Sequence, residues 1–303
     1  MNNFIALFLT PAFAFAILRV TTPILFASLG SVISDKAGVS NIAMEGTMLT
    51  ASLAGVLASA YSGSAFVGLL AALLVGVLFS AFMAYISLYL GTKIIMAGIA
   101  LNLFASSFTV YVLYMFTGQK GNSASLASKQ LPTIDLPIIK DIPVLGEILS
   151  GHNVLVYVAL ISIVVIYVML NRTKLGAHIK AVGENPSAAA SVGINVRKVQ
   201  FISLCLSGLL AGFGGAFMSM GYLSMFTRDM IAGRGWIAIA ASAMGKSMVI
   251  PTVITSFLFG IFSAVGNVLQ LQNMPSELIS TLPYVAVFIG LVGYSIRKSK
   301  KEN

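Results

Sequence analysis

The sequence predicts an all-α, polytopic integral membrane protein. Hydrophobic residues fill 58% of the 303 positions and charged residues only 9%, whereas soluble domains carry roughly 25% charged residues. Several uncharged runs approach the roughly 20 residues that a helix needs to cross the hydrocarbon core of a bilayer. The charged residues gather between these runs, as they do in the loops of a multispanning protein.

The uncharged runs locate the predicted spans. No charged residue lies between Glu45 and Lys93, and the polar turn at 61–64 divides this run into two helices. One further span falls within the first 34 residues. The other predicted spans cover residues 42–60, 66–90, 94–116, 154–170, 199–219, 249–270 and 278–296.

The distribution of positive charge predicts the topology. The 171–198 segment and the 297–303 tail are both rich in Lys and Arg, so both are predicted to be cytoplasmic. An even number of crossings must separate them, and the three runs between them require a fourth. The run 231–244 is the candidate. It is short and contains Gly233 and Gly235, so we expect a short or broken helix buried among others.

These assignments predict one transmembrane domain over residues 1–303 with about nine spans, within a range of eight to ten. The amino terminus is predicted to be extracytoplasmic, as is the neutral, proline-containing loop at about 117–152. The loop at about 171–198 and the basic tail at 297–303 are predicted to be cytoplasmic.

The sequence lacks the motifs of a self-contained enzyme or pump. His152 and His178 fall in different loops, so they cannot form a zinc pair on one helix, and a single cysteine excludes cysteine metal clusters. The Gly245-Lys246-Ser247 string resembles the end of a phosphate-binding loop, but Ala240 replaces its first glycine. We therefore expect no metal, no ATP and no other cofactor on this chain, and no catalytic residues.

The net charge of +9 does not indicate a nucleic-acid partner. A nucleic-acid binder concentrates its basic residues on one soluble face. Here the basic residues separate apolar runs, so membrane lipid is the expected surrounding.

Polar residues inside the predicted spans have two interpretations. They can line a path for a small, polar, uncharged solute, or they can hydrogen-bond neighbouring helices. For the glutamate the second interpretation is an anchor at the cytoplasmic interface or a pair with Lys36. The path candidates are Asn41, Glu45, Asn102, Ser106 and Asn267.

A small-residue stripe runs along the predicted span 199–219. Gly208 and Gly212 are four apart and are followed by Gly214 and Gly215. Such a stripe lets another helix approach closely. The partner helix can belong to this chain or to a second subunit.

The cytoplasmic loop contains a short predicted helix over 187–192. Asn185 suits the N-cap position, Pro186 the first helical position and Gly193 the end of the helix. A short helix of small residues with turns at both ends can be gripped by a partner protein; the alternative is a solvated loop.

This loop resembles a known family. The string Gly183-Glu184-Asn185-Pro186 and the helix after it are similar to the coupling loop of permease subunits in ATP-binding cassette importers for branched-chain amino acids, simple sugars and nucleosides. The strings at 38–46 (Gly-Val-Ser-Asn-Ile-Ala-Met-Glu-Gly) and 232–240 (Ala-Gly-Arg-Gly-Trp-Ile-Ala-Ile-Ala) resemble two other segments of that family. The likeness covers nearly the whole chain and is greatest to the sugar and nucleoside branch.

The resemblance implies a bacterial plasma-membrane permease subunit for a small polar solute, with a nucleoside as the first candidate and a simple sugar as the second. Its implied partners are a cytoplasmic ATPase that binds ATP and Mg²⁺, a second permease subunit, identical or homologous, and an extracytoplasmic solute-binding protein or lipoprotein. The implied ATPase-coupling residues are Gly183, Glu184, Asn185, Pro186, Ala188, Ala189 and Gly193.

The alternative is an ATP-independent carrier or channel. The spans contain no string of buried carboxylates, arginines or histidines of the kind that proton-coupled carriers use. This weakens the carrier interpretation.

Overall fold

The computed structural model describes residues 10–135, 137, 145–270 and 285 of the chain. In this part, six helices are long and apolar enough to cross a bilayer, so the chain is a multi-pass membrane protein. Five are α2 (Pro11–Lys36), α4 (Ala65–Leu88), α5 (Ile94–Thr117), α7 (Val154–Arg172) and α12 (Val249–Gln270), and the sixth joins α10 (Val196–Phe217) to the π-helical turn η1 (Met218–Tyr222).

These helices confirm the predicted positions of six spans to within a few residues. The predicted span 278–296 and the tail 297–303 lie outside the described residues. The predicted span 42–60 corresponds to α3 (Met44–Ser62), and the predicted short helix 231–244 corresponds to α11 (Arg234–Met244).

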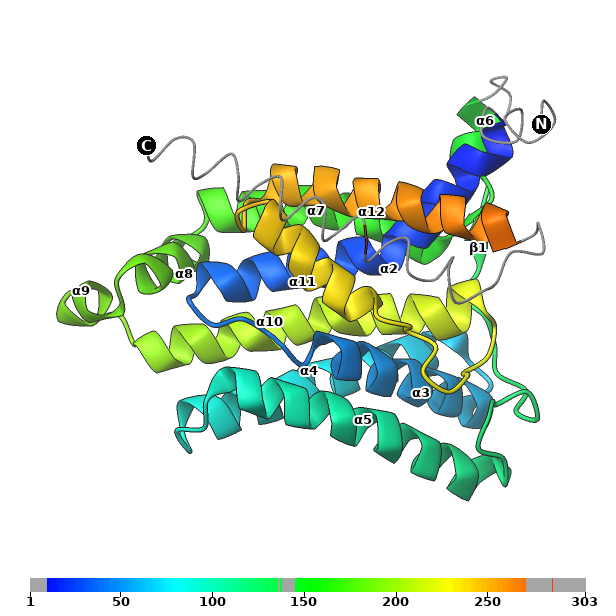
Figure 1. Cartoon of the computed structure of the whole chain (residues 1–303), viewed down its shortest axis with the longest axis horizontal. Coiled ribbons are helices and arrows are strands. Elements are labelled where there is room, and N and C mark those ends of the chain that lie inside the picture. Colours follow the sequence, from blue (N-terminus) through cyan, green and yellow to red (C-terminus); the bar gives the residue numbers. More distant parts are fainter. Residues whose placement is uncertain (1–9, 136, 138–144, 271–284, 286–303) are drawn as a thin grey trace.

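The long helices lie side by side, with α10 between two groups (Figure 1). It packs against α3 and α4 on one side and against α2 on the other, and α2 packs in turn against α7, α11 and α12. The glycine stripe of α10 faces this interior: a Cβ on Gly208 would overlap the Gly76 carbonyl of α4, and one on Gly215 would overlap the Met48 carbonyl of α3. The stripe is thus an internal packing surface.

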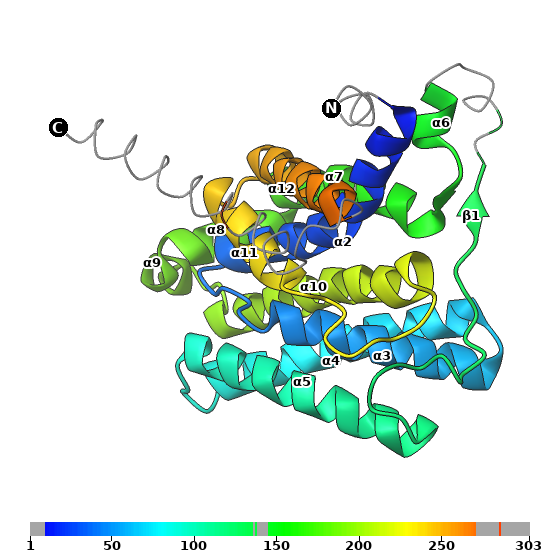
Figure 2. The same ribbon diagram turned by 45° about the vertical axis from the view of Figure 1, so that its right-hand side comes forward.

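The predicted extracytoplasmic loop contains little regular structure. Strand β1 (Thr133–Ile134) pairs antiparallel with β2 (His152–Asn153), and the short helix α6 (Leu145–Leu149) lies between them in sequence. Figure 2 shows this loop at the end of the bundle opposite the loop that carries α8 (Lys174–Glu184) and α9 (Pro186–Ser191).

Two helices begin inside the bundle. Residues 37–43 form no helix, and α3 starts beside Asn102, which lies about 12 Å along α5 at roughly 1.5 Å per residue. Helix α11 has 11 residues, a length of about 16 Å, too short to cross a core of about 30 Å. This agrees with the short helix expected from its sequence.

Candidate functional site: a polar junction inside the helix bundle

The first turns of α3 and α11 meet through Glu45, and we call this contact the polar junction. Its Oε1 accepts a hydrogen bond from the Gly233 N–H at 2.7 Å, and its Oε2 accepts one from the Gly235 N–H at 2.7 Å. The first N–H groups of a helix have no partner within the helix and carry a partial positive charge. Glu45 satisfies two of them and supplies a compensating negative charge. It therefore binds the start of α11 and not Lys36.

The close approach of the two helices requires glycine at position 235. A Cβ there would lie 2.6 Å from the Glu45 backbone nitrogen and 2.8 Å from its Oε2. Real Cβ atoms do not come this close to other atoms. The glycine-rich sequence before α11 thus fits the contact with α3.

Asn102 connects α5 to the same junction. Its Oδ1 accepts from the Gly46 N–H at 2.8 Å, and its Nδ2 donates to the Ile42 carbonyl oxygen at 2.8 Å. Both ends of the amide are therefore bound to the chain that leads into α3. This is the helix-bridging role that the sequence left open.

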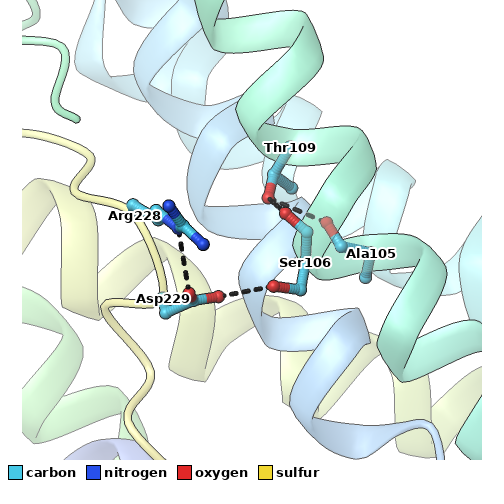
Figure 3. Close-up of polar contacts among 5 residues, drawn as sticks. All are labelled: Ala105, Ser106, Thr109, Arg228 and Asp229. Atoms are coloured by element: carbon cyan, nitrogen blue, oxygen red, sulfur yellow. Dashed lines mark hydrogen bonds and ion pairs between the residues drawn. The ribbon is translucent and has the colours of Figure 1, made fainter. Parts of the chain in front are cut away.

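Ser106, one turn further along α5, contacts a charged pair (Figure 3). Its Oγ donates to Asp229 Oδ1 at 2.7 Å, and Arg228 Nε lies 3.4 Å from Asp229 Oδ2. The Arg228 and Asp229 side chains are 64% and 52% exposed. Both residues belong to the non-helical segment before α11.

The other two path candidates lie apart from this junction. Asn41 is buried, and its Nδ2 donates to the hydroxyls of Ser80 on α4 and Ser207 on α10, at 3.2 and 3.0 Å. Asn267 is exposed on α12, and no hydrogen bond among the described residues joins it to the junction.

The short helix predicted over 187–192 is present as α9 (Pro186–Ser191). Asn185 caps it, with Oδ1 accepting from the Ala188 N–H at 3.0 Å, Pro186 is its first residue, and Gly193 beyond its end has φ 86°. The side chains of Glu184 and Ala188 are exposed, whereas Ala189 is buried.

Helix α8, which joins α7 to α9, was not predicted from the sequence. Thr173 caps it by accepting a hydrogen bond from the Gly176 N–H at 3.1 Å. Gly183 near its end packs against the Lys36 carbonyl at the end of α2, where a Cβ would overlap that group. The segment that carries α8 and α9 therefore touches the chain that leads into the junction.

Arg228 and Asp229 are functional candidates that the sequence patterns did not indicate. They fall between two predicted spans, where charged residues are ordinary. The one signal in the sequence is that the connection between the predicted segments 199–219 and 231–244 is short, which leaves little room for a solvated loop. Among the described residues, no three His, Cys, Asp or Glu side chains gather as a metal site.

Helices that begin inside the bundle, with polar groups at their starts, are typical of membrane transport proteins. Comparison with known proteins identifies the family. Residues 13–292 match the family described as "Branched-chain amino acid transport system / permease component". The chain belongs to this family. Its relatives are permease subunits, the membrane components of their transporters, so this chain is not itself catalytic.

Relatives with assigned substrates are similar over most of their length. The nucleoside ABC transporter permease protein NupC of Lactococcus lactis is 31% identical over 89% of this chain and 88% of its own. The guanosine ABC transporter permease protein NupQ of Bacillus subtilis is 30% identical over 92% of this chain and 90% of its own. A putative glucose ABC transporter permease of Haloferax volcanii is 29% identical over 91% and 83%.

A solved structure has the same fold. PsaBC from Streptococcus pneumoniae in complex with Fab superposes with a TM-score of 0.56, covering 95% of this chain and 94% of the matched chain. The identity of 17% limits this likeness to the fold.

Proposed function

We propose that this chain forms part of the translocation path of an ATP-driven importer and that the solute is a nucleoside. The observation that carries the proposal is the polar junction of Glu45, Asn102 and Ser106, where two helices begin inside the bundle. Transporters commonly place their solute sites at discontinuous helices of this kind. Asn41 and Asn267 are proposed to contribute further along the path.

The substrate named for two relatives favours a nucleoside. NupC and NupQ are named for nucleosides and guanosine, and each covers about nine-tenths of this chain. A simple sugar is the second candidate because of the putative glucose permease. Uptake of labelled guanosine, uridine, glucose and ribose into cells with and without this subunit tests the choice, and uptake of sugars alone would overturn it.

The proposed coupling runs through α9. A separate cytoplasmic ATPase, carrying ATP and Mg²⁺, grips the exposed side chains of the 183–193 segment. The contact between Gly183 and Lys36 passes the displacement to α2 and to residues 37–43, which lead into α3. A second permease subunit and an extracytoplasmic solute-binding protein complete the proposed assembly, and this chain itself binds no cofactor.

The proposed topology has nine spans. The six long helices account for six of them, and α3, the segment 223–244 that ends in α11, and the uncharged run 278–296 supply three more. The amino terminus is outside, and the coupling segment and carboxyl terminus are inside a bacterial plasma membrane. Labelling of Lys180 by an impermeant amine reagent is expected only in inside-out vesicles. Labelling from outside intact cells would contradict this orientation.

A double substitution tests the coupling. Glu184→Arg with Ala188→Trp changes two exposed side chains, so we expect normal insertion but loss of ATP-driven uptake. Ala124→Trp, at an exposed position of the opposite loop, is the control and is expected to transport normally. Normal uptake by the double variant would refute the coupling role.

A further inference from the structure

Asp229 of the charged pair Arg228–Asp229 contacts the middle of helix α5 through Ser106. Ser106, which donates to Asp229, is about 18 Å from the start of α5 and about 17 Å from its end. A charge at the centre of a bilayer costs roughly 2.5–3.5 kcal/mol on insertion scales. Exposed charges at this depth therefore face water or polar groups and not lipid.

The surrounding chain fixes the pair in place. The backbone N–H of Arg228 donates to the Gly121 carbonyl oxygen at 2.9 Å. Nearby, the Ser123 N–H donates to the Phe226 carbonyl oxygen, and the Phe226 N–H donates to the Ser123 hydroxyl. Asp229 has φ 51°, a left-handed conformation that non-glycine residues adopt infrequently. Such conformations persist where the surrounding structure enforces them, and they cluster at functional sites.

The pair keeps hydrogen-bonding capacity that the described residues do not use. A carboxylate offers about four acceptor positions, and Asp229 uses one for Ser106 and one for Arg228. Arg228 has five N–H donors, of which Nε alone contacts Asp229 in the described structure. Glu45 also accepts two hydrogen bonds, both at the start of α11, but its side chain is only partly exposed, whereas that of Asp229 is 52% exposed. Asp229 is thus the carboxylate of this region with free acceptor positions on an exposed face.

These groups suit an uncharged solute with adjacent hydroxyls. The carboxylate accepts from two hydroxyl hydrogens, the guanidinium donates to hydroxyl oxygens, and the pair has no net charge. Hydrogen bonds to charged groups are stronger than neutral ones. We propose that Asp229, oriented by Ser106 and paired with Arg228, binds the 2′- and 3′-hydroxyls of a ribonucleoside in the translocation path. This inference rests on the proposed function.

Paired solutes test the contact. In cells carrying the complete transporter, Asp229→Asn is expected to lower guanosine uptake about tenfold and uptake of 2′,3′-dideoxyguanosine less than about twofold. For each solute, uptake by the variant is divided by uptake by the wild type. Because both transporters use the same solute-binding protein, its preference between the two solutes cancels. Ser162→Ala, which removes a hydroxyl from the middle of α7, is the control and is expected to change neither uptake.

The outcomes separate the two proposals. Equal loss of both solutes, or no loss, overturns the diol contact and leaves the proposed nucleoside function standing. Failure of the wild type to take up any nucleoside overturns the proposed function, and the diol contact with it.

Accessibility gives a second test if Asp229→Asn does not assemble. Cys205 is the only cysteine, so Cys205→Ser provides a background for single cysteines. In it, Ser106→Cys is expected to react with an impermeant methanethiosulfonate reagent at least threefold more slowly when guanosine is present. Val164→Cys, an exposed residue in the middle of α7, is expected not to react. Lack of reaction at position 106, or reaction that guanosine does not slow, overturns the inference.

Discussion

The Oε2 of Glu45 accepts a hydrogen bond from the Gly235 N–H at 2.7 Å, directly at the start of α11. A glutamate of this chain therefore occupies the position where the start of a half-helix would otherwise attract an anion. The contact joins the two helices that begin inside the bundle. An anionic solute would have to compete with a carboxylate that is already bound, which agrees with an uncharged solute.

Replacing Gly235 with alanine is expected to separate α3 from α11. The new Cβ would lie 2.6 Å from the Glu45 backbone nitrogen, so the helices must move apart or α11 must shift. We expect solute uptake to fall at least tenfold while the subunit still inserts. Gly121→Ala is the control, because a Cβ there meets no atom within 4 Å. Equal uptake by both variants would show that the close approach is unimportant.

Glu45→Gln is expected to destabilise the subunit. Glutamine keeps one acceptor oxygen but turns an NH₂ group towards a backbone N–H, and it removes the charge at the start of α11. A loss of about 2 kcal/mol is expected, since hydrogen bonds to charged groups contribute roughly 1.5–3 kcal/mol each. Thermal melting of the purified complex measures the loss. Glu147→Gln, at an exposed position of α6, should melt as the wild type does.

Asn102→Asp distinguishes the two hydrogen bonds of this side chain. The acceptor for the Gly46 N–H remains, but a carboxylate oxygen now faces the Ile42 carbonyl oxygen. Two acceptors repel, so we expect the aspartate to be at least as destabilising as alanine, by about 1–3 kcal/mol. Melting curves of Asn102→Asp, Asn102→Ala and wild type give the order. A milder effect for aspartate would mean that the Ile42 bond contributes little.

The stability of the loop that carries β1 and β2 is expected to depend on pH through His152. This side chain is 2% exposed and stacks on Phe15 with ring centroids 3.8 Å apart. Burial lowers the pKa of His152, and the nearby Arg19 lowers it further, whereas a hydrogen bond to the Ile148 carbonyl raises it. The folded chain thus resists protonation that the unfolded chain accepts below a pH of about 6.5.

The sign of the effect follows from this difference. Between the unfolded pKa near 6.5 and the lower folded pKa, the unfolded chain binds more protons, so the free energy of unfolding decreases as pH falls. Above about pH 6.5 the contribution is constant. Melting temperatures between pH 7.5 and 5.5 should fall less in His152→Phe than in the wild type. His178→Phe, at an exposed position, is the control, and identical slopes in all three proteins would contradict the prediction.

Most helices could be predicted from hydrophobicity, charge and end signals because each of these depends on nearby residues. The uncharged runs located the long helices, and the Asn185-Pro186 pair located α9 from the sequence alone. Helix α8 was missed because Lys174, His178 and Lys180 give it the composition of a solvated loop, and only Thr173 marks its start.

The site was harder to predict from the sequence, since its contacts join residues far apart in the chain. Glu45 and Asn102 were identified as polar residues in spans, but their partners depend on where α3 and α11 begin. Arg228 and Asp229 look like residues of an outer loop until the fold places them beside Ser106. Asn267 has the same sequence signal as Asn102, yet it is exposed on α12.

The irregular stretch 37–43 relies on neighbouring helices for part of its backbone hydrogen bonding. Asn102 of α5 donates to the Ile42 carbonyl, Gln200 of α10 donates to the Ala37 carbonyl, and Ser34 of α2 accepts from the Asn41 N–H. In a membrane an unsatisfied backbone group costs several kcal/mol. Substitutions at positions 34, 102 and 200 should therefore show epistasis with one another, and homologues that lose one of these side chains should carry a compensating donor or acceptor nearby.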